Sequence, residues 1–526
     1  MIASFLTLVA AGVGFATRTA ALPAWESQFN ISGAQFGGIL GAGFLGFGAM
    51  IFFGGILVEK FGYKTLLAVA FIMHLISAAM FFLAGPMFES ATESDPATAT
   101  ATVVSLLWFS TVLFSICQGL YEAVVNPLVA DLYPENKTHY LNILHAGWPA
   151  GMIIGGIFAA CFMGNSPWIT EIAWEISMSV FVLFVLAYGA LALTEKMPPT
   201  ASSADSSGLG GAFACFTSIP FLVLLVIHGM VGYMELGVDS WMASLMESLL
   251  PNAIIVLVYT SALMFILRFF AGPIVHRINP IGLLLASSVI ACLGLLWLGQ
   301  PTESLVMVFA AATFYSLGKA FLWPTMLGVA GEQYPRSGAV AMGAMGAAGM
   351  LTVGLVAGPR IGAQQGEGFS RTLRTNAPDT FERYADAEMT SAWGLDYRSV
   401  SGAKAAAAKA VEVGEDGGIA GTEPFEAAEQ IAVDEKSLLI ANAAVDVPAV
   451  QAANVTGGRI ALTKTAIMPA MMAIGFLGLF VYYATKGGYK PVGLETREGE
   501  GSQPRVGTET DPEVAPGIDQ PAPSEY

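Results

Sequence analysis

The chain has 526 residues, of which 55% are hydrophobic and 12% charged. With a mean hydropathy of +0.63, this composition excludes a soluble enzyme. The 23 Lys and Arg against 40 Asp and Glu give a net charge of −17, which excludes the basic surface that nucleic acid requires. The four cysteines stand singly in apolar runs, so neither disulfides nor a zinc site are predicted.

Apolar segments long enough to cross a bilayer recur along the chain. A membrane-spanning helix needs about 20 predominantly apolar residues. The first segment lacks the basic start of a signal peptide and contains Arg18, so we predict a retained helix there. In all we predict twelve spans, at residues 2–22, 34–58, 65–86, 103–132, 140–163, 174–194, 213–246, 254–275, 280–299, 305–329, 339–361 and 462–485.

The short turns between these spans differ in their basic residues. Lys and Arg accumulate in the short loops on the cytoplasmic side of a membrane. The short odd-numbered turns contain none, whereas the even-numbered turns contain Lys60, Lys64, Lys137, Lys196, Arg277 and Arg336. We therefore predict an integral protein of the inner, or cytoplasmic, membrane with both termini in the cytoplasm.

Polar segments divide the chain into domains. Residues 363–461 hold 8 Lys and Arg and 15 Asp and Glu. This Ala-rich insertion has few large apolar residues for a core of its own, so we expect only short helices over the outer mouth. The predicted order is an N-terminal bundle at 1–195, a cytoplasmic linker at 196–212, helices seven to eleven at 213–362, the extracytoplasmic insertion at 363–461, the twelfth helix at 462–486 and a disordered cytoplasmic tail at 487–526.

Two short patterns occur in both halves of the chain. GGILVEKFGYK after the second span corresponds to AGPIVHRINP after the eighth, and GLYEAVVNP in the fourth span corresponds to SLGKAFLWP in the tenth. In the second comparison the prolines align, and Glu122 falls opposite Lys319. Repeated halves are common in transporters, which place substrate between them.

These features resemble the major facilitator superfamily over nearly all the chain except the insertion and tail. The resemblance implies an all-α integral membrane fold with twelve transmembrane helices in two pseudo-symmetric six-helix bundles. Glu replaces the usual Asp of the family's loop signature, and His276 stands at that acid position in the second copy. The implied cytoplasmic gate consists of Gly55, Glu59, Lys60, Gly62 and Lys64, with Arg277 in the second copy.

A narrower stretch, residues 121–151, is similar to the fourth and fifth helices of fucose and glucose permeases. The matching residues include Glu122, Asn126 and Asn142, and residues 233–241 also look like their seventh helix. This resemblance implies a sugar:proton symporter with Glu122 at the proton-linked position. The sequence departs from that pattern at His145, Trp148 and Pro149.

Ionisable groups inside spans are costly, at about 2.5–3.5 kcal/mol each on insertion scales, so each should face a cavity or a partner. Glu122 is the predicted proton site, with Lys319 as its partner in coupling. The alternative is a permanent structural ion pair of Glu122 with Arg18 or Lys319. Arg268 is expected to snorkel toward the membrane edge.

Further side chains are candidates for contact with substrate. Glu235 and Asp239 are four residues apart, which places both on one helix face; Glu235 is expected to point into the cavity, and Asp239 to meet water. Amide, imidazole and indole groups suit the O–H and C–H groups of a sugar. The predicted substrate-binding residues are Arg18, Asn126, Asn142, His145, Trp148, Glu235, Trp241 and Trp323.

We therefore predict a secondary active transporter that moves a small polar solute, expected to be a sugar, by alternating access with proton symport. The chain is expected to act as a monomer, without nucleic acid, and no catalytic residues, cofactor or metal are predicted. One alternative is a proton-antiport exporter of drugs or metabolites. The other is a nontransporting membrane sensor whose outer insertion recognises a ligand.

Overall fold

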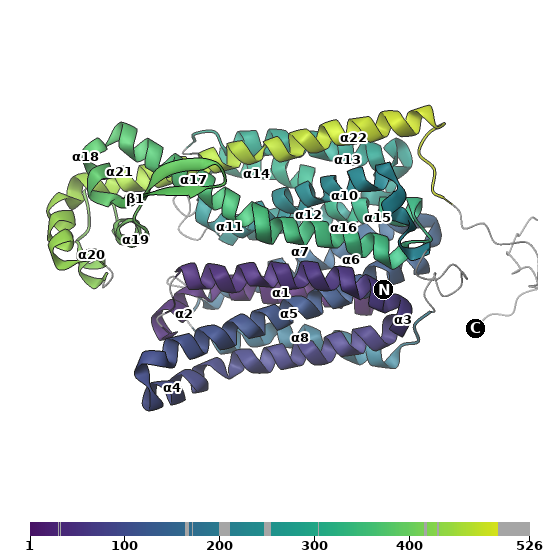
Figure 1. Cartoon of the computed structure of the whole chain (residues 1–526), viewed down its shortest axis with the longest axis horizontal. Helices are drawn as coiled ribbons and strands as arrows, with labels where there is room; N and C mark the ends of the chain where they lie inside the picture. Colours follow the sequence, from purple (N-terminus) through teal and green to yellow (C-terminus); the bar gives the residue numbers. More distant parts are fainter. Residues whose placement is uncertain are drawn as a thin grey trace, which may run out of the picture. The chain divides into compact units, whose positions relative to one another are not determined.

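Long apolar helices build most of the computed structural model (Figure 1). Ten helices in the described part of the chain are long and apolar enough to cross a membrane. The description covers residues 1–29, 31, 33–163, 168–170, 172–198, 211–246, 254–302, 304–414, 418–428 and 431–492. The predicted linker lies partly, and the predicted tail mostly, outside these residues.

The N-terminal half ends with the helix that precedes the predicted linker. Its longest element, α3, is two helices joined at Gly62, whose φ of +74° is a left-handed backbone angle that suits glycine. One of the ten long helices therefore contains two predicted spans. The elements are α1 (Ile2–Ala20), α2 (Leu22–Phe29), α3 (Gly33–Phe82), α4 (Ala84–Ser94), α5 (Pro96–Leu132), η1 (Pro134–Asn136), α6 (Lys137–His145), α7 (Gly147–Phe162) and α8 (Trp174–Thr194).

The C-terminal half has shorter elements because several of its spans are interrupted. Two π-helical turns, η4 and η5, stand in the seventh and eleventh spans and contact each other. Together with α3, the short apolar α12 accounts for the difference between ten long helices and twelve predicted spans; the count of twelve itself stays a prediction. The elements are η3 (Ala214–Thr217), α10 (Ile219–Gly232), η4 (Tyr233–Gly237), α11 (Val238–Met246), α12 (Ile254–Arg268), α13 (Ala271–Leu298), α14 (Leu305–Lys319), α15 (Leu322–Gln333), α16 (Gly338–Thr352), η5 (Val353–Ala357), α17 (Gly358–Asn376) and α22 (Ile467–Thr485).

Equivalent helices of the two halves pack in the same way through glycine. A Cβ added to Gly12 of α1 would lie 3.0 Å from the Cα of Gly151 in α7. A Cβ added to Gly232 of α10 would lie 2.8 Å from the Cα of Gly349 in α16. These pairs join the first span to the fifth and the seventh to the eleventh, as two pseudo-symmetric bundles require. Small residues allow such close approach of membrane helices.

The structure of the insertion differs from the prediction of short helices without a core. It contains a hairpin of β1 (Ala385–Ala392) and β2 (Leu395–Val400), whose turn residues Trp393 and Gly394 both have positive φ. The helices are α18 (Pro378–Tyr384), α19 (Gly402–Ala410), α20 (Glu423–Ala427) and the 33-residue α21 (Val433–Thr465). Figure 1 shows this region at the end of the molecule opposite the N-terminus.

A separate hydrophobic cluster holds the insertion together. Phe381, Phe425 and Leu439 are buried in it among many alanines and valines. The sequence prediction counted large apolar side chains and so underestimated this core, because small residues from α19 and α21 pack closely. The predicted boundaries at 363 and 461 fall inside α17 and α21, which continue from the membrane-spanning region into the insertion.

Asp446 anchors α18 to α21 and is fully buried. Its carboxylate accepts hydrogen bonds from Thr380 at 2.7 Å and from Nε of Arg383 at 2.7 Å. The hydrogen bond that Arg383 donates to Asp446 raises the pKa of the Arg383 guanidinium above its ordinary value, so Arg383 keeps its positive charge at physiological pH. Breaking a buried pair by removing one partner costs about 3–5 kcal/mol.

We expect Asp446→Ala to loosen the insertion while the membrane-spanning bundles stay folded. Limited proteolysis should then cleave between residues 378 and 447 much faster than in the wild type, with the remaining fragments still associated. Glu388→Ala, at an exposed position of β1, is the matched control and should leave the cleavage rate unchanged. Equal cleavage of the Asp446→Ala variant and the wild type would contradict the anchoring role.

Candidate functional site

Two buried ion pairs lie inside the C-terminal half. Nη2 of Arg268 is 3.1 Å from Oε1 of Glu235, and Nζ of Lys319 is 2.5 and 2.6 Å from the two carboxylate oxygens of Asp239. All four side chains are buried. Pairing reduces the cost of placing these charges in an apolar interior.

The π-helical turn η4 carries Glu235 just before Asp239 at the start of α11. Its wider winding changes the direction of the side chains that follow, and such turns are frequent at functional sites. Glu235 therefore meets Arg268 of α12, whereas Asp239 meets Lys319 of α14. The expectation that Asp239 meets water was wrong, since only 7% of the residue is exposed.

Arg268 occupies the centre of the arrangement, so the prediction that it snorkels was also wrong. In addition to Glu235, it donates through Nε to the carbonyl of Ala320 at 2.8 Å and through Nη1 to the carbonyl of His145. Each of these carbonyls lies four residues before a proline, Pro324 and Pro149 respectively. Because proline has no N–H, neither carbonyl can receive the usual helical hydrogen bond, and the guanidinium supplies the missing donor.

Glu122 is the buried carboxylate of the N-terminal half and is 4% exposed. It is hydrogen-bonded to the amide of Asn126, and Arg268 is the cation that acts on it electrostatically. Its Oε2 has no hydrogen-bond partner among the described residues. Lys319 is instead held by Asp239, so in this conformation Glu122 forms the predicted structural ion pair with neither Lys319 nor Arg18.

A polar chain joins the two halves at this level. The ring Nε2 of His145 and Oδ1 of Asn126 are 3.0 Å apart. Asn126 thus connects Glu122 to His145, whose carbonyl is bound by Arg268. Of the sequence candidates, the structure brings together Glu122, Asn126, His145 and Glu235 around Arg268.

Further polar contacts join the two halves toward the end where the N-terminus lies (Figure 1). They join α6 to α13 and α15. Nδ2 of Asn142 donates to Oγ1 of Thr325 at 3.1 Å, and Oγ1 of Thr138 donates to Glu332 at 2.6 Å. The backbone N–H of Gly272 donates to Nδ1 of His139 at 3.1 Å. Sequence reasoning missed Thr138, His139, Thr325 and Glu332, since polar residues near span ends carry no distinctive local signal.

The predicted gate residues have different surroundings. A Cβ on Gly55 would lie 2.7 Å from the carbonyl oxygen of Ala339 in the other half, so Gly55 belongs to the contact between the halves. Lys64 donates to the carbonyl of Glu195 at 3.0 Å, within its own half. Lys60 lies 5.3 Å from the ring centre of neighbouring Phe61, and Arg277 is exposed. Glu59 is half-buried beside the kink at Gly62.

The remaining candidates contact other side chains and backbone groups. Arg18 stacks on Phe114, 3.4 Å from its ring centre, and donates to the carbonyl of Gly14 at 3.0 Å. Trp148 contacts Phe15 with ring centres 5.5 Å apart. Trp323 contacts His228 at 4.4 Å, and Trp241 packs against Gly362 at the base of the insertion.

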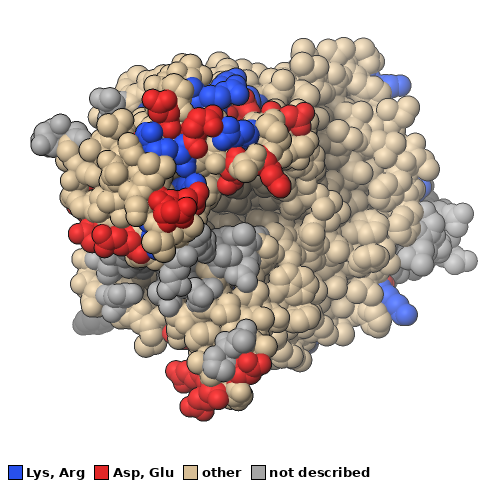
Figure 2. Space-filling model, turned by 60° about the vertical axis from the view of Figure 1, so that its left-hand side comes forward, with Lys and Arg blue, Asp and Glu red and all other residues tan. Residues whose placement is uncertain are grey.

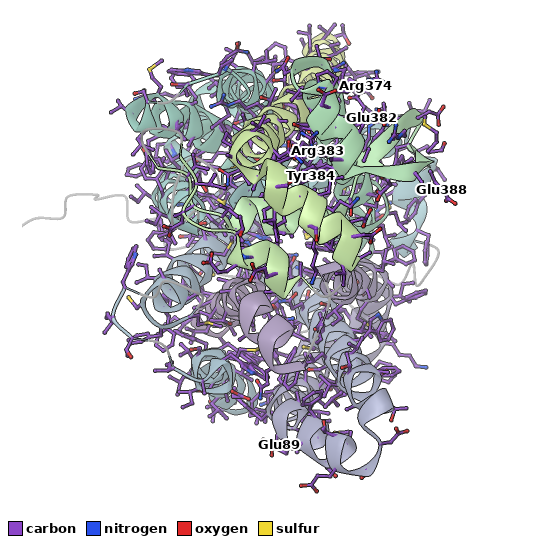
Figure 3. All side chains as sticks on the ribbon, turned by 90° about the vertical axis from the view of Figure 1, so that its left-hand side faces the viewer. Glu89, Arg374, Glu382, Arg383, Tyr384 and Glu388 are labelled. Atoms are coloured by element: carbon purple, nitrogen blue, oxygen red, sulfur yellow. The ribbon has the colours of Figure 1, made fainter. Side chains whose placement is uncertain are left out.

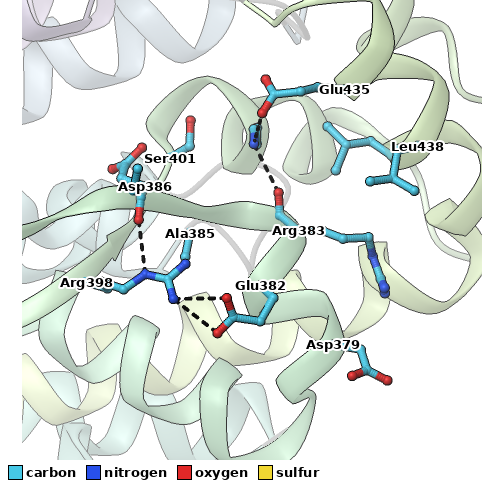
Figure 4. Close-up of a pocket in the computed structure, with 12 residues that line it drawn as sticks. Asp379, Glu382, Arg383, Ala385, Asp386, Arg398, Ser401, Glu435 and Leu438 are labelled. Carbon is cyan, nitrogen blue, oxygen red and sulfur yellow. Dashed lines mark hydrogen bonds and ion pairs between the residues drawn. The ribbon is translucent and has the colours of Figure 1, made fainter.

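The insertion contains an open pocket of about 790 Å³ (Figure 4). Figure 2 shows acidic and basic side chains gathered on this part of the surface. Arg398 pairs with Glu382 at 3.0 Å, and Lys404 pairs with Glu435 at 2.7 Å; Arg383 is held by Asp446. The basic side chains that line the pocket are thus engaged within the insertion, so we place the candidate transport site between the bundles.

Comparisons with known proteins agree with this architecture. A family model described as the Major Facilitator Superfamily matches residues 4–359. A bacterial homolog of the human lysosomal transporter Spinster, in an inward-facing conformation, is similar with a TM-score of 0.57 and 16% identity, over 93% of this chain and 98% of that chain. No curated protein sequence matches the chain.

Two similar solved structures are sugar transporters. The proton:xylose symporter XylE has a TM-score of 0.56 and 15% identity, over 67% of this chain and 87% of that chain. The fucose:proton symporter FucP of E. coli has a TM-score of 0.51 and 18% identity, over 68% of this chain and 90% of that chain. At these identities the likeness shows the fold alone.

Proposed function

The chain belongs to the Major Facilitator Superfamily and is a membrane transporter rather than an enzyme; from this premise we propose that it is a sugar:proton symporter. Substrate and proton would cross together by alternating access between the two bundles. The structures of FucP and XylE, each described as a sugar:proton symporter, support the choice of substrate class.

The observation that carries the proposal is the unequal pairing of the buried carboxylates. Glu235 and Asp239 each have a cation in direct contact, whereas Glu122 has no ion-pair partner among the described residues. A carboxylate without a partner in an apolar interior is readily neutralised by a proton. Glu122 is therefore our proton site, and Lys319 holds Asp239 in the opposite half.

Substrate is proposed to bind between the halves, close to Glu122. Asn126 and His145 offer hydrogen bonds to hydroxyl groups there. Asn142 belongs to the neighbouring contacts between α6 and α15. Trp148 and Trp323 offer flat apolar faces to the C–H groups of a sugar ring. Arg18, Glu235 and Trp241 are proposed as contacts that form in other conformations of the cycle.

The location of the two ends supports the proposed topology. Figure 1 shows the N-terminus and the end of α22 on the same side of the molecule and the insertion on the other. With the basic turns of the sequence in the cytoplasm, both termini are proposed to be cytoplasmic and the insertion extracytoplasmic. We propose that the protein acts as a monomer in the cytoplasmic membrane.

Binding and flux measurements on the full chain test this function. A thermal-shift screen against monosaccharides, disaccharides and organic anions should show stabilisation by sugars, because ligands that bind the native state raise its stability. In proteoliposomes, the stabilising sugar should accumulate when the exterior is acidic. Accumulation under the opposite gradient would favour the antiport exporter, and binding without any flux would favour the sensor.

A further inference from the structure

Arg268 contacts elements of both halves of the protein. Its backbone belongs to α12, and its side chain reaches Glu235 in η4, the Ala320 carbonyl between α14 and α15, and the His145 carbonyl at the end of α6. The first two contacts lie within the C-terminal half. The third crosses to the N-terminal half, so one guanidinium spans the surfaces that must separate during alternating access.

The acceptors explain why arginine is needed here. Pro149 and Pro324 leave two carbonyls without helical donors in an apolar interior, and leaving a buried carbonyl without a hydrogen bond is destabilising. Guanidinium offers several N–H groups in a fixed planar fork, whereas lysine offers a single point charge. When the halves separate, the His145 carbonyl loses its donor unless water or another group replaces it.

The charges around Arg268 make this contact sensitive to one proton. From η4 and α11 it faces Glu235 and Asp239, and from α5 it faces Glu122; His145 faces it from α6, and Lys319 of α14 is held by Asp239. The ion pair of Arg268 and Glu235 has no net charge. The ion pair of Lys319 and Asp239 has none either. Ionised Glu122 adds one negative charge on the N-terminal side, and this charge attracts the guanidinium on the C-terminal side.

We propose that Arg268 is the residue through which protonation of Glu122 controls separation of the two halves at the cytoplasmic end. This inference rests on the proposed proton site. Ionised Glu122 attracts Arg268 and holds it on the His145 carbonyl. This keeps α6 and α15 in contact, so the cytoplasmic end stays closed. Protonation of Glu122 removes that attraction, α6 and α15 separate, and the space between the halves opens to the cytoplasm. Arg268 acts through Glu122 and the closing contacts, so it is a positioning residue.

Distance measurements across the cytoplasmic end test this without knowledge of the substrate. Spin labels would be placed at the exposed positions Glu135 in the N-terminal half and Arg277 in the C-terminal half, on an introduced ketone-bearing amino acid that leaves the native cysteines unchanged. The full chain in lipid nanodiscs would be measured at pH 8 and pH 5. We expect the open-to-closed ratio of the wild type to rise by about tenfold at pH 5, within the usual range of coupling between sites.

The variants separate the inference from the proposed function. Glu122→Gln should show the open-biased ratio at both pH values. The double variant Arg268→Gln with Glu235→Gln removes both partners together, which avoids leaving a buried charge alone, and it should lose the pH response although Glu122 is intact. If Glu122→Gln keeps the response, the proposed proton site is wrong. If only the double variant keeps it, the role of Arg268 is wrong and the proton site stands.

Two further variants distinguish an electrostatic from a purely structural role. Arg268→Lys retains the charge with fewer hydrogen bonds, so the closed population should fall while the pH response remains. Pro149→Ala gives α7 its own donor to the His145 carbonyl and changes no charge, so it should also lower the closed population. Loss of the pH response in Arg268→Lys, or an unchanged closed population in Pro149→Ala, would overturn the mechanism.

Discussion

Replacing Glu122 by Gln is expected to abolish accumulation of the sugar against its gradient while exchange of sugar across the membrane continues. With one proton carried per sugar, each pH unit supports roughly tenfold accumulation, since one unit corresponds to 1.36 kcal/mol. Gln keeps the size and hydrogen-bonding ability of Glu but takes up no proton. The accumulation ratio should therefore fall from roughly ten to about one per pH unit.

The measurement compares two assays on the same proteoliposomes. Accumulation driven by an acidic exterior reports coupling, and counterflow at equal pH reports the movement of loaded carrier alone. Glu89→Gln is the matched control, because Glu89 is exposed on α4 and lies away from the labelled residues of the insertion (Figure 3). Undiminished accumulation in Glu122→Gln would show that another group carries the proton, and loss of counterflow would assign Glu122 to substrate binding.

Separating the Lys319–Asp239 pair is expected to destabilise the protein more than removing the pair altogether. Both groups are buried, so Lys319→Met alone leaves an uncompensated carboxylate, at a cost of about 3–5 kcal/mol. Asp239→Asn alone leaves an uncompensated ammonium group. The double variant contains neither charge, and such replacements of buried pairs are often neutral.

Thermal unfolding of the purified variants checks this order. The midpoints should be lowest for the two single variants and close to that of the wild type for the double variant. Arg371→Gln removes an exposed side chain that lies 3.6 Å from Glu367, which keeps its pair with Lys464, and should change stability by less than about 1 kcal/mol. A double variant as unstable as the singles would mean that Lys319 or Asp239 stabilises the fold through other contacts.

The sequence predicted many of the residues in the site but not which side chains contact each other. Glu122, Asn126 and His145 were predicted as functional from their place inside spans, and the structure joins them in one chain. Arg268 and Asp239 were assigned to the membrane edge and to water because distance along a span was the only guide. The π-helical turn at η4 changes the direction of the side chains, and no local pattern in YMELG predicts it.

The sequence by itself determined that the chain is a membrane protein of two related helical bundles. Runs of about 20 apolar residues, turn charges and repeated Gly and Pro patterns are local properties, and a bilayer leaves helices few alternatives. Only the tertiary structure decided which cation meets which carboxylate and which helix supplies a donor to each proline-freed carbonyl. Those contacts join residues from 33 to 123 positions apart in the chain, as in Arg268 with Glu235 and Arg268 with His145, and depend on how the helices are rotated against each other. The core of the insertion was decided in the same way, since its small apolar residues become a core only when α19 packs on α21.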